Sequence, residues 1–201
     1  MNLPKPVQEF IDVFSELPSL GPRQATRLAF RLIRQGPSTI NRLAKSSALL
    51  GKIKVCSQCF FIHDAEGSLC DICTDTKRDN GIFLIVEKET DLMSIERSGA
   101  YRGRYLVIGE ASKSGALEPW QSMRLSVLKK TITDTAPLGK AQEIIIGTNP
   151  STYSDAMGNR IKHELEGYTE TITFLGRGIP TGGEIEFSDE ETLSHALNRR
   201  Q

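Results

Sequence analysis

Four cysteines are the residues of this chain whose types and spacing most directly indicate chemistry. Cys56 and Cys59 form one C-x-x-C pair, Cys70 and Cys73 form a second, and the chain has no other cysteine. Two such pairs separated by a short loop suit one tetrahedral metal ion, because each pair turns tightly and presents two sulfurs. Zinc is the expected ion, ahead of iron. A site closed by four sulfurs has no open position for a substrate, so we predict structural zinc.

Disulfide bonds and redox chemistry are the alternatives for these cysteines. Two structural disulfides need an oxidising compartment, whereas residues 1–10 hold two prolines, a lysine and a glutamate and lack the apolar stretch of a signal peptide. A redox C-x-x-C rarely occurs as a matched pair. His63 lies between the two pairs, and we expect it on the surface of a small hairpin that turns at Glu66-Gly67.

Arginines at helical spacing mark a second candidate site. Apolar periodicity predicts helices over 6–16 and from Pro22 onward, joined by a short loop that ends in glycine. Such a loop suits a phosphate, because backbone N–H groups point outward at the helix N-terminus and the helix dipole favours an anion. Arginines one and two turns further along can hold neighbouring phosphates. The predicted DNA-binding residues are Gly21, Arg23, Arg27, Arg31 and Arg34.

Charge is distributed unevenly, although the chain as a whole has a net charge of zero. Residues 1–54 contain nine Lys/Arg against three Asp/Glu, whereas the remainder contains 16 against 22. A basic first quarter favours a polyanion such as DNA. The alternative is a helical bundle with a solvated arginine face. No apolar run approaches the roughly 20 residues of a membrane span.

Strands that alternate with helices are predicted for the acidic remainder of the chain. Apolar runs at 82–86, 105–108, 143–147 and 171–175 indicate buried strands, with helical segments between them. This alternation predicts βαβ units and a parallel sheet. A glycine-rich loop follows the last strand, but it lacks the lysine and the spacing of a phosphate-binding P-loop.

Polar residues follow two of the predicted strands. Glu87 ends the first strand, where α/β sheets place functional groups. This arrangement resembles a Toprim domain, in which such a glutamate is the general acid or base and a later strand ends in Asp-x-Asp to hold magnesium. Here Asn149 follows the later strand, and Asp155 comes only in the next helix. One carboxylate holds Mg²⁺ poorly, so a working two-carboxylate phosphoryl-transfer centre is not expected. Glu87, Asn149 and Asp155 are predicted to form an acidic, partner-binding surface, in which Glu87 has a weak cation-binding or partner-binding role. A solvated, strand-end Glu87 is the alternative.

These motifs in this order resemble the RecR family of bacterial recombination mediators over nearly the whole chain. The segment at 17–30 is similar to the family's helix-hairpin-helix, a DNA-binding motif without sequence specificity, with Ser19 in place of its usual first glycine. The four cysteines are similar to its zinc finger. Other matching segments are Glu87, 95–97, 101–105, 148–150 and 176–197, and the last contains a specific Gly-Ile-Pro-Thr-Gly-Gly run.

The resemblance implies a multidomain α/β protein. Its expected parts are a helix-hairpin-helix DNA-binding module over 1–53, a four-cysteine zinc finger over 54–77, a Toprim domain with a parallel sheet over 78–175, and a C-terminal glycine-rich loop and helix over 176–201.

The resemblance also implies a DNA repair protein without catalysis of its own. Family members assemble as ring-like tetramers, hold DNA, and act with RecO and in some settings RecF to load the recombinase RecA onto gapped DNA. By position, Arg23 and Arg27 correspond to the basic residues that the family uses on DNA. A cytoplasmic, nucleoid-associated protein is therefore expected.

Two stretches depart from the family pattern, at 110–121 and 153–155. Both are expected on the Toprim surface where the partner docks, so we expect RecO recognition to differ in this chain. Trp120 lies in the first stretch, and it is expected to pack under its own loop rather than to anchor an interface. The alternative function is a Toprim-type metal-dependent nuclease or nicking enzyme that uses Glu87 with Asp155.

Overall fold

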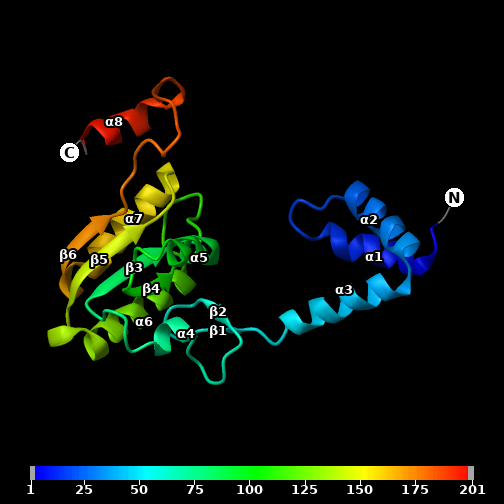
Figure 1. Ribbon diagram of the computed structural model, residues 1–201, viewed down its shortest axis with the longest axis horizontal. Coiled ribbons are helices and arrows are strands. Elements are labelled where there is room, and N and C mark those ends of the chain that lie inside the picture. Colours follow the sequence, from blue (N-terminus) through cyan, green and yellow to red (C-terminus); the bar gives the residue numbers. More distant parts are fainter. Residues whose placement is uncertain (1–2, 199–201) are drawn as a thin grey trace. The chain divides into compact units, whose positions relative to one another are not determined.

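The computed structural model describes residues 3–198. The chain forms two compact units, Met1–Ile53 and Lys54–Gln201, whose elements are labelled in Figure 1. Residues 199–201, the end of the predicted C-terminal segment, lie outside the described residues. Among the described helices, none is long and apolar enough to cross a membrane.

Three helices make up the first unit: α1 (Lys5–Ser15), α2 (Pro22–Gln35) and α3 (Pro37–Leu50) (Figure 1). Each has a proline in its first turn, where the missing N–H removes no helical hydrogen bond. Gly36 separates α2 from α3 at φ 84°, a conformation that a β-carbon disfavours. α1 packs against α2, whose buried side consists of Ala25, Ala29 and Leu32. The small alanines let the two helices approach closely.

The second unit is built on a four-stranded parallel sheet in the order β4-β3-β5-β6 (Figure 1). The strands are β3 (Ile82–Val86), β4 (Arg104–Val107), β5 (Ala141–Gly147) and β6 (Thr169–Phe174). They are connected by α5 (Glu89–Ser98), α6 (Pro119–Thr135) and α7 (Thr152–Leu165), with 3-10 turns at Pro137–Gly139 and Glu166–Tyr168. The chain leaves β3 toward β4 and returns to β5 on the other side of β3. The carboxyl ends of β3 and β5 therefore flank the crevice where such sheets bind ligands.

Side-chain alternation along the strands gives the sheet two apolar faces. Phe83 and Ile85 of β3 pack in one core with buried residues of α6 and α7. Leu84 and Val86 pack in a second core, which includes Leu92 of α5 and three of the cysteines. Both faces of β3 are covered, and this is why this central strand is a continuous apolar run in the sequence.

A small module precedes the sheet. It contains the antiparallel strands β1 (Lys54–Val55) and β2 (Ile62–His63) and the short helix α4 (Asp71–Thr74). The hairpin formed by these two strands encloses the first cysteine pair. The sequence predicted the hairpin between the two pairs, so its predicted position is wrong. The expected surface location of His63 is also wrong for its polar atoms, because both ring nitrogens are shielded from solvent and have no hydrogen-bond partner among the described residues.

The C-terminal segment forms a 3-10 turn at Ile185–Phe187 and then α8 (Glu190–Asn198). Asp189 caps α8, because its carboxylate accepts hydrogen bonds from the Thr192 N–H at 2.8 Å and the Thr192 hydroxyl at 2.9 Å. The N-terminal helices, the four-cysteine cluster, the parallel sheet and the C-terminal helix confirm the predicted fold class. The boundaries of the four predicted domains stay a prediction.

Candidate metal centre, nucleic-acid face and sheet-edge site

The four cysteine sulfurs converge on one point. They lie within 4.8 Å of one another, a spread that suits a tetrahedron of thiolates around an ion held at about 2.3 Å. All four cysteines are free. The sulfurs of Cys59 and Cys70 are 3.5 Å apart, well beyond the ~2.05 Å of a disulfide bond. The cluster can therefore hold a metal ion.

Hydrogen bonding among the thiols opposes full ionisation of this cluster in the absence of a cation. Hydrogen bonds with Cys59, Cys70 and Cys73 lower the pKa of Cys56, whereas the hydrogen bond with Cys56 raises the pKa of Cys59. A divalent cation removes this competition, because all four thiols can then ionise together. The backbone N–H of Cys70 also donates to the Cys56 sulfur at 3.4 Å. A set of four such sulfurs fits zinc.

Contacts from β4 fix the metal module to the sheet. The N–H of Val107 donates to the carbonyl of Cys59 at 2.8 Å, so the first cysteine pair covers part of the open edge of β4. The Arg104 guanidinium donates to the carbonyls of Ile72 and Cys73 at 2.9 and 3.0 Å. The sequence did not single out Arg104, because an arginine at the start of a strand gives no local signal for its acceptors. The metal centre is thus part of the core of the second unit.

The turn between α1 and α2 forms the hairpin of the helix-hairpin-helix. Ser19 occupies the position of a glycine at φ 64°, a left-handed conformation that costs an L-residue about 1–2 kcal/mol. Gly21 precedes α2 in an extended conformation, and its carbonyl accepts the Ala25 N–H at 3.0 Å. The unpaired N–H groups of the first turn of α2 therefore follow the hairpin directly.

Four arginines of α2 are exposed beside this hairpin: Arg23, Arg27, Arg31 and Arg34. Within residues 3–53, no carboxylate lies within ion-pair distance of any of them. Arg34 directs its Nε to the carbonyl of Phe30 at 3.3 Å. Because no protein anion neutralises these four charges within their own unit, they are available to an external polyanion. Their role in binding DNA stays a prediction.

Glu87 is buried at the carboxyl end of β3 and accepts two hydrogen bonds from Asn149. Its exposed fraction is 4%. The Asn149 backbone N–H donates to Oε1 at 2.9 Å, and the side-chain amide donates to Oε2 at 3.2 Å. The interpretation of Glu87 as a solvated strand-end residue is therefore wrong. The register of β3 against β5, which sets Val86 opposite Gly147, brings the two residues together.

Asp155 is paired with Arg177, from the segment after β6, in a two-pronged ion pair. Sequence reasoning missed Arg177, whose only signal is a position between two glycines. The two acids of the alternative nuclease, Glu87 and Asp155, are thus each engaged by a different nitrogen donor. Across residues 3–198, the cysteine cluster is the single group of three or more His, Cys, Asp or Glu residues close enough to share an ion.

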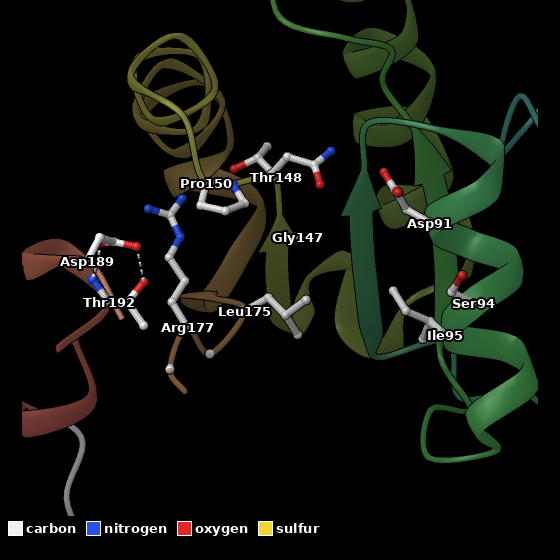
Figure 2. Close-up of a pocket in the computed structure, with 13 residues that line it drawn as sticks. Asp91, Ser94, Ile95, Gly147, Thr148, Pro150, Leu175, Arg177, Asp189 and Thr192 are labelled. Carbon is white, nitrogen blue, oxygen red and sulfur yellow. Dashed lines mark hydrogen bonds between the residues drawn. The ribbon is translucent and has the colours of Figure 1, made fainter. Parts of the chain in front are cut away.

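A pocket of about 570 Å³ opens at this edge of the sheet. Figure 2 shows α5 with Asp91, Ser94 and Ile95 on one side, and Leu175 and Arg177 of the C-terminal segment on the other. The pocket also includes the residues that follow β5, among them Asn149. It lies where a doubly wound parallel sheet accepts a ligand, and its polar lining contains charges of both signs.

The two stretches that depart from the family pattern lie together. A β-carbon on Gly115 would come within 3.1 Å of the Tyr153 carbonyl, so the 110–118 loop packs directly on the start of α7. Trp120 packs against Gly109 and the Arg124 guanidinium, which lies 4.8 Å from the ring centroid. The expectation that Trp120 packs under its own loop is met only in part, because 43% of the residue is exposed.

Comparison with known proteins identifies the family. Residues 7–48 match the RecR helix-hairpin-helix family, and residues 178–201 match the RecR C-terminal family. The Recombination protein RecR of Paenarthrobacter aurescens (strain TC1) is 35% identical over 97% of this chain and 96% of its own length. Those of Roseiflexus castenholzii and Mycolicibacterium smegmatis are each 36% identical, over 99% and 98% of this chain and 95% and 97% of their own lengths. With full-length identity above one third and both terminal segments matched, this chain belongs to the RecR family of recombination proteins.

Proposed function

We propose that this chain is a non-enzymatic recombination mediator that holds DNA through α2. It helps to load a RecA-type recombinase onto gapped DNA, together with RecO-like and RecF-like partners, on the nucleoid in the cytoplasm. Membership of the RecR family supports a role in recombination and DNA repair. The observation that carries the DNA-binding part is the set of exposed α2 arginines that have no carboxylate partner within their unit.

The proposed DNA contacts begin at the hairpin. Backbone N–H groups after Gly21 bind one phosphate at the N-terminus of α2, where the helix dipole also favours the negative charge. Arg23 and Arg27 bind the adjacent phosphates, and Arg31 and Arg34 extend the contact along the helix. Such contacts position the protein on DNA without reading its sequence.

The proposed metal is zinc in a structural role at Cys56, Cys59, Cys70 and Cys73. Zinc supplies no chemistry for a substrate in a site closed by four sulfurs. Its contribution is to hold together the two cysteine turns that pack in one core with Leu84 and Val86 of β3. Metal binding and folding of the second unit are therefore coupled.

Assembly of the chain as a tetramer is the proposed quaternary state, with contacts through the terminal regions. Exposed apolar residues in both units support the proposed assembly. None of the α3 residues is buried, and Leu49 and Leu50 on that helix are 48% and 71% exposed. Near the other terminus, Ile185 and Phe187 are 69% and 79% exposed. Contact with other copies would bury this area.

The proposed partner surface is the carboxyl edge of the sheet together with the neighbouring loops. Glu87, Asn149 and Asp155 lie at this edge. The 110–118 loop packs on the start of α7 near it, and both contribute exposed residues, among them Lys113 and Tyr153. A RecO-like protein is the proposed occupant. Trp120, with nearly half of its surface exposed, contributes a contact at the border of that surface.

The experiment that tests the proposal is DNA binding by the full chain at two salt concentrations, with the mass measured by light scattering. We expect a tetramer whose affinity falls steeply with salt, because each phosphate contact releases a counterion. Arg23→Ala with Arg27→Ala should weaken binding and make the log–log salt dependence shallower by about two, one for each lost phosphate contact. Arg102→Ala with Lys113→Ala removes the same charge from the second unit and serves as the control. Unchanged affinity in the α2 variant would exclude α2 from the DNA role.

Plasmid nicking distinguishes the nuclease alternative. We expect no cleavage with Mg²⁺ or Mn²⁺ by the parent chain, because each of the two candidate acids is already engaged by a nitrogen donor. Cleavage that disappears in Glu87→Gln would overturn the proposal of a non-enzymatic mediator.

A further inference from the structure

An exposed phenylalanine lies within the arginine face of α2. Phe30 follows Arg27 by three residues and precedes Arg34 by four, and residues three and four apart are neighbours on a helix surface. Arg23, Arg27, Phe30 and Arg34 therefore form one continuous row along α2. Phe30 is 41% exposed, and the Arg34 Nε atom lies 3.3 Å from its carbonyl. The face contains an aromatic ring between cationic side chains.

Phe30 is not required by the core of its unit. The buried side of α2 consists of Ala25, Ala29 and Leu32, and α1 packs against α2. Phe30, with 41% of the residue exposed, leaves apolar area in water, which is unfavourable. A ligand that covers the ring would recover that free energy.

The chemistry of the row selects its ligand. Guanidinium groups bind phosphates, and an exposed aromatic ring provides a platform on which an unpaired base stacks. A duplex offers phosphates along its backbone, but its bases are already stacked on one another and present only their edges. A single strand offers both a phosphate and a free base face within one nucleotide.

We infer that α2 binds a single-stranded segment of DNA, with Phe30 stacked on one base and Arg23, Arg27 and Arg34 on the flanking phosphates. The inference rests on the proposed DNA-binding function of α2 and assigns its substrate class as unpaired rather than duplex DNA. An apolar protein surface is disfavoured as the occupant, because burying three arginines without a carboxylate partner carries a large desolvation cost. A second copy of the same face would bring arginines against arginines.

The test measures the affinity of the full chain for a fluorescent oligo-dT and for a duplex of equal length, at one salt concentration. Phe30→Ala should weaken binding to the single strand by roughly five-fold or more, the loss of one stacked base. It should change duplex affinity by less than two-fold. Phe30→Trp should retain single-strand affinity, and in a Trp120→Phe background its fluorescence should be quenched by oligo-dT. Ile33→Ala, which removes an exposed apolar residue of α2 outside the row, is the matched control.

The possible outcomes separate this inference from the proposed function. If Arg23→Ala with Arg27→Ala weakens binding and Phe30→Ala affects both DNA forms equally or neither, the inference is wrong and α2 remains the DNA face. If the arginine variant binds like the parent, the DNA-binding function of α2 is wrong. If Phe30→Ala lowers the mass measured by light scattering and leaves both affinities unchanged, the ring is a contact between protein chains and the inference is overturned.

Discussion

Replacement of Arg104 by methionine should loosen the metal module from the sheet. The Arg104 guanidinium donates hydrogen bonds to the carbonyls of Ile72 and Cys73 at 2.9 and 3.0 Å and to Oδ1 of Asn80 at 2.7 Å. The two carbonyls belong to the second and third residues of the four-residue helix α4, and the last four C=O groups of a helix have no partner within it. Methionine keeps the aliphatic length of the side chain but removes all three donors.

The expected loss in the free energy of unfolding of the second unit is about 2–4 kcal/mol, because a hydrogen bond that involves a charged group contributes about 1.5–3 kcal/mol. Three such bonds would give a larger sum. Arg104, Ile72 and Cys73 are only partly buried, however, so water replaces part of what is lost. Metal release to a chelator should also be faster, since α4 positions Cys73 and begins directly after Cys70.

The assay is a urea titration followed by the fluorescence of Trp120, the single tryptophan of the chain. The indole contacts the Arg124 guanidinium, which also lies over the Phe60 ring at 4.8 Å, so the signal reports on the second unit. A colorimetric chelator measures metal release in parallel. Arg102→Met is the matched control, because Arg102 is exposed and has no side-chain hydrogen bond or ion pair among the described residues. Unfolding free energies of Arg104→Met and Arg102→Met that agree within about 0.5 kcal/mol would refute the reasoning.

Three further predictions concern the metal, the sheet edge and pH. Cys56→Ser should abolish stoichiometric metal binding and lower the melting temperature of the second unit, because Cys56 is fully buried in the core. Metal analysis and calorimetry check this prediction, and a melting temperature equal to that of the parent would contradict it. Asn149→Asp should place a second carboxylate next to Glu87 and destabilise the second unit by about 2–3 kcal/mol. An unaltered midpoint in a urea titration would show that the contact between residues 87 and 149 contributes little to stability. Burial raises the pKa of Glu96, but the hydrogen bonds with Arg78 and Tyr105, together with the charge of Arg78, outweigh it and leave that pKa below its ordinary value. A carboxyl group whose pKa is depressed in the folded state stabilises the protein above the unfolded pKa of about 4.3, and this stabilisation is lost as the pH falls. Glu96→Gln should therefore be less stable than the parent near pH 7, and the difference in stability should shrink in acid. Parallel stability curves of the two proteins from pH 7 to pH 3 would oppose this assignment.

The secondary structure was largely predictable because its signals are local. The apolar run at 82–86 coincides with β3, and the three later runs each fall within a residue or two of the observed strands. Strands covered on both faces must be apolar along their whole length, so they stand out in the sequence. The C-x-x-C spacing predicted the convergence of the four sulfurs for a similar reason, since each pair forms its own tight turn.

The positions of polar partners were not predictable. Asn149 lies 62 residues beyond Glu87, and only the pairing of β3 with β5 brings the two together. Without that register, a glutamate at a strand end is equally consistent with a solvated side chain. Arg104 and Arg177 were missed because each finds its acceptors on another element, at a distance along the chain that no short motif encodes.

The sequence by itself determined the family, the parallel α/β unit, the cysteine site and the arginine face of α2, because periodicity and short-range spacing encode these features directly. Only the tertiary structure decided that the metal module forms part of the core beneath the sheet, that Glu87 is buried against Asn149, and that Phe30 remains exposed among the arginines. Each of these depends on which side chains from distant segments fill the same space. That outcome is set by strand register and by packing against both faces of the sheet and along the helix, which no single segment specifies.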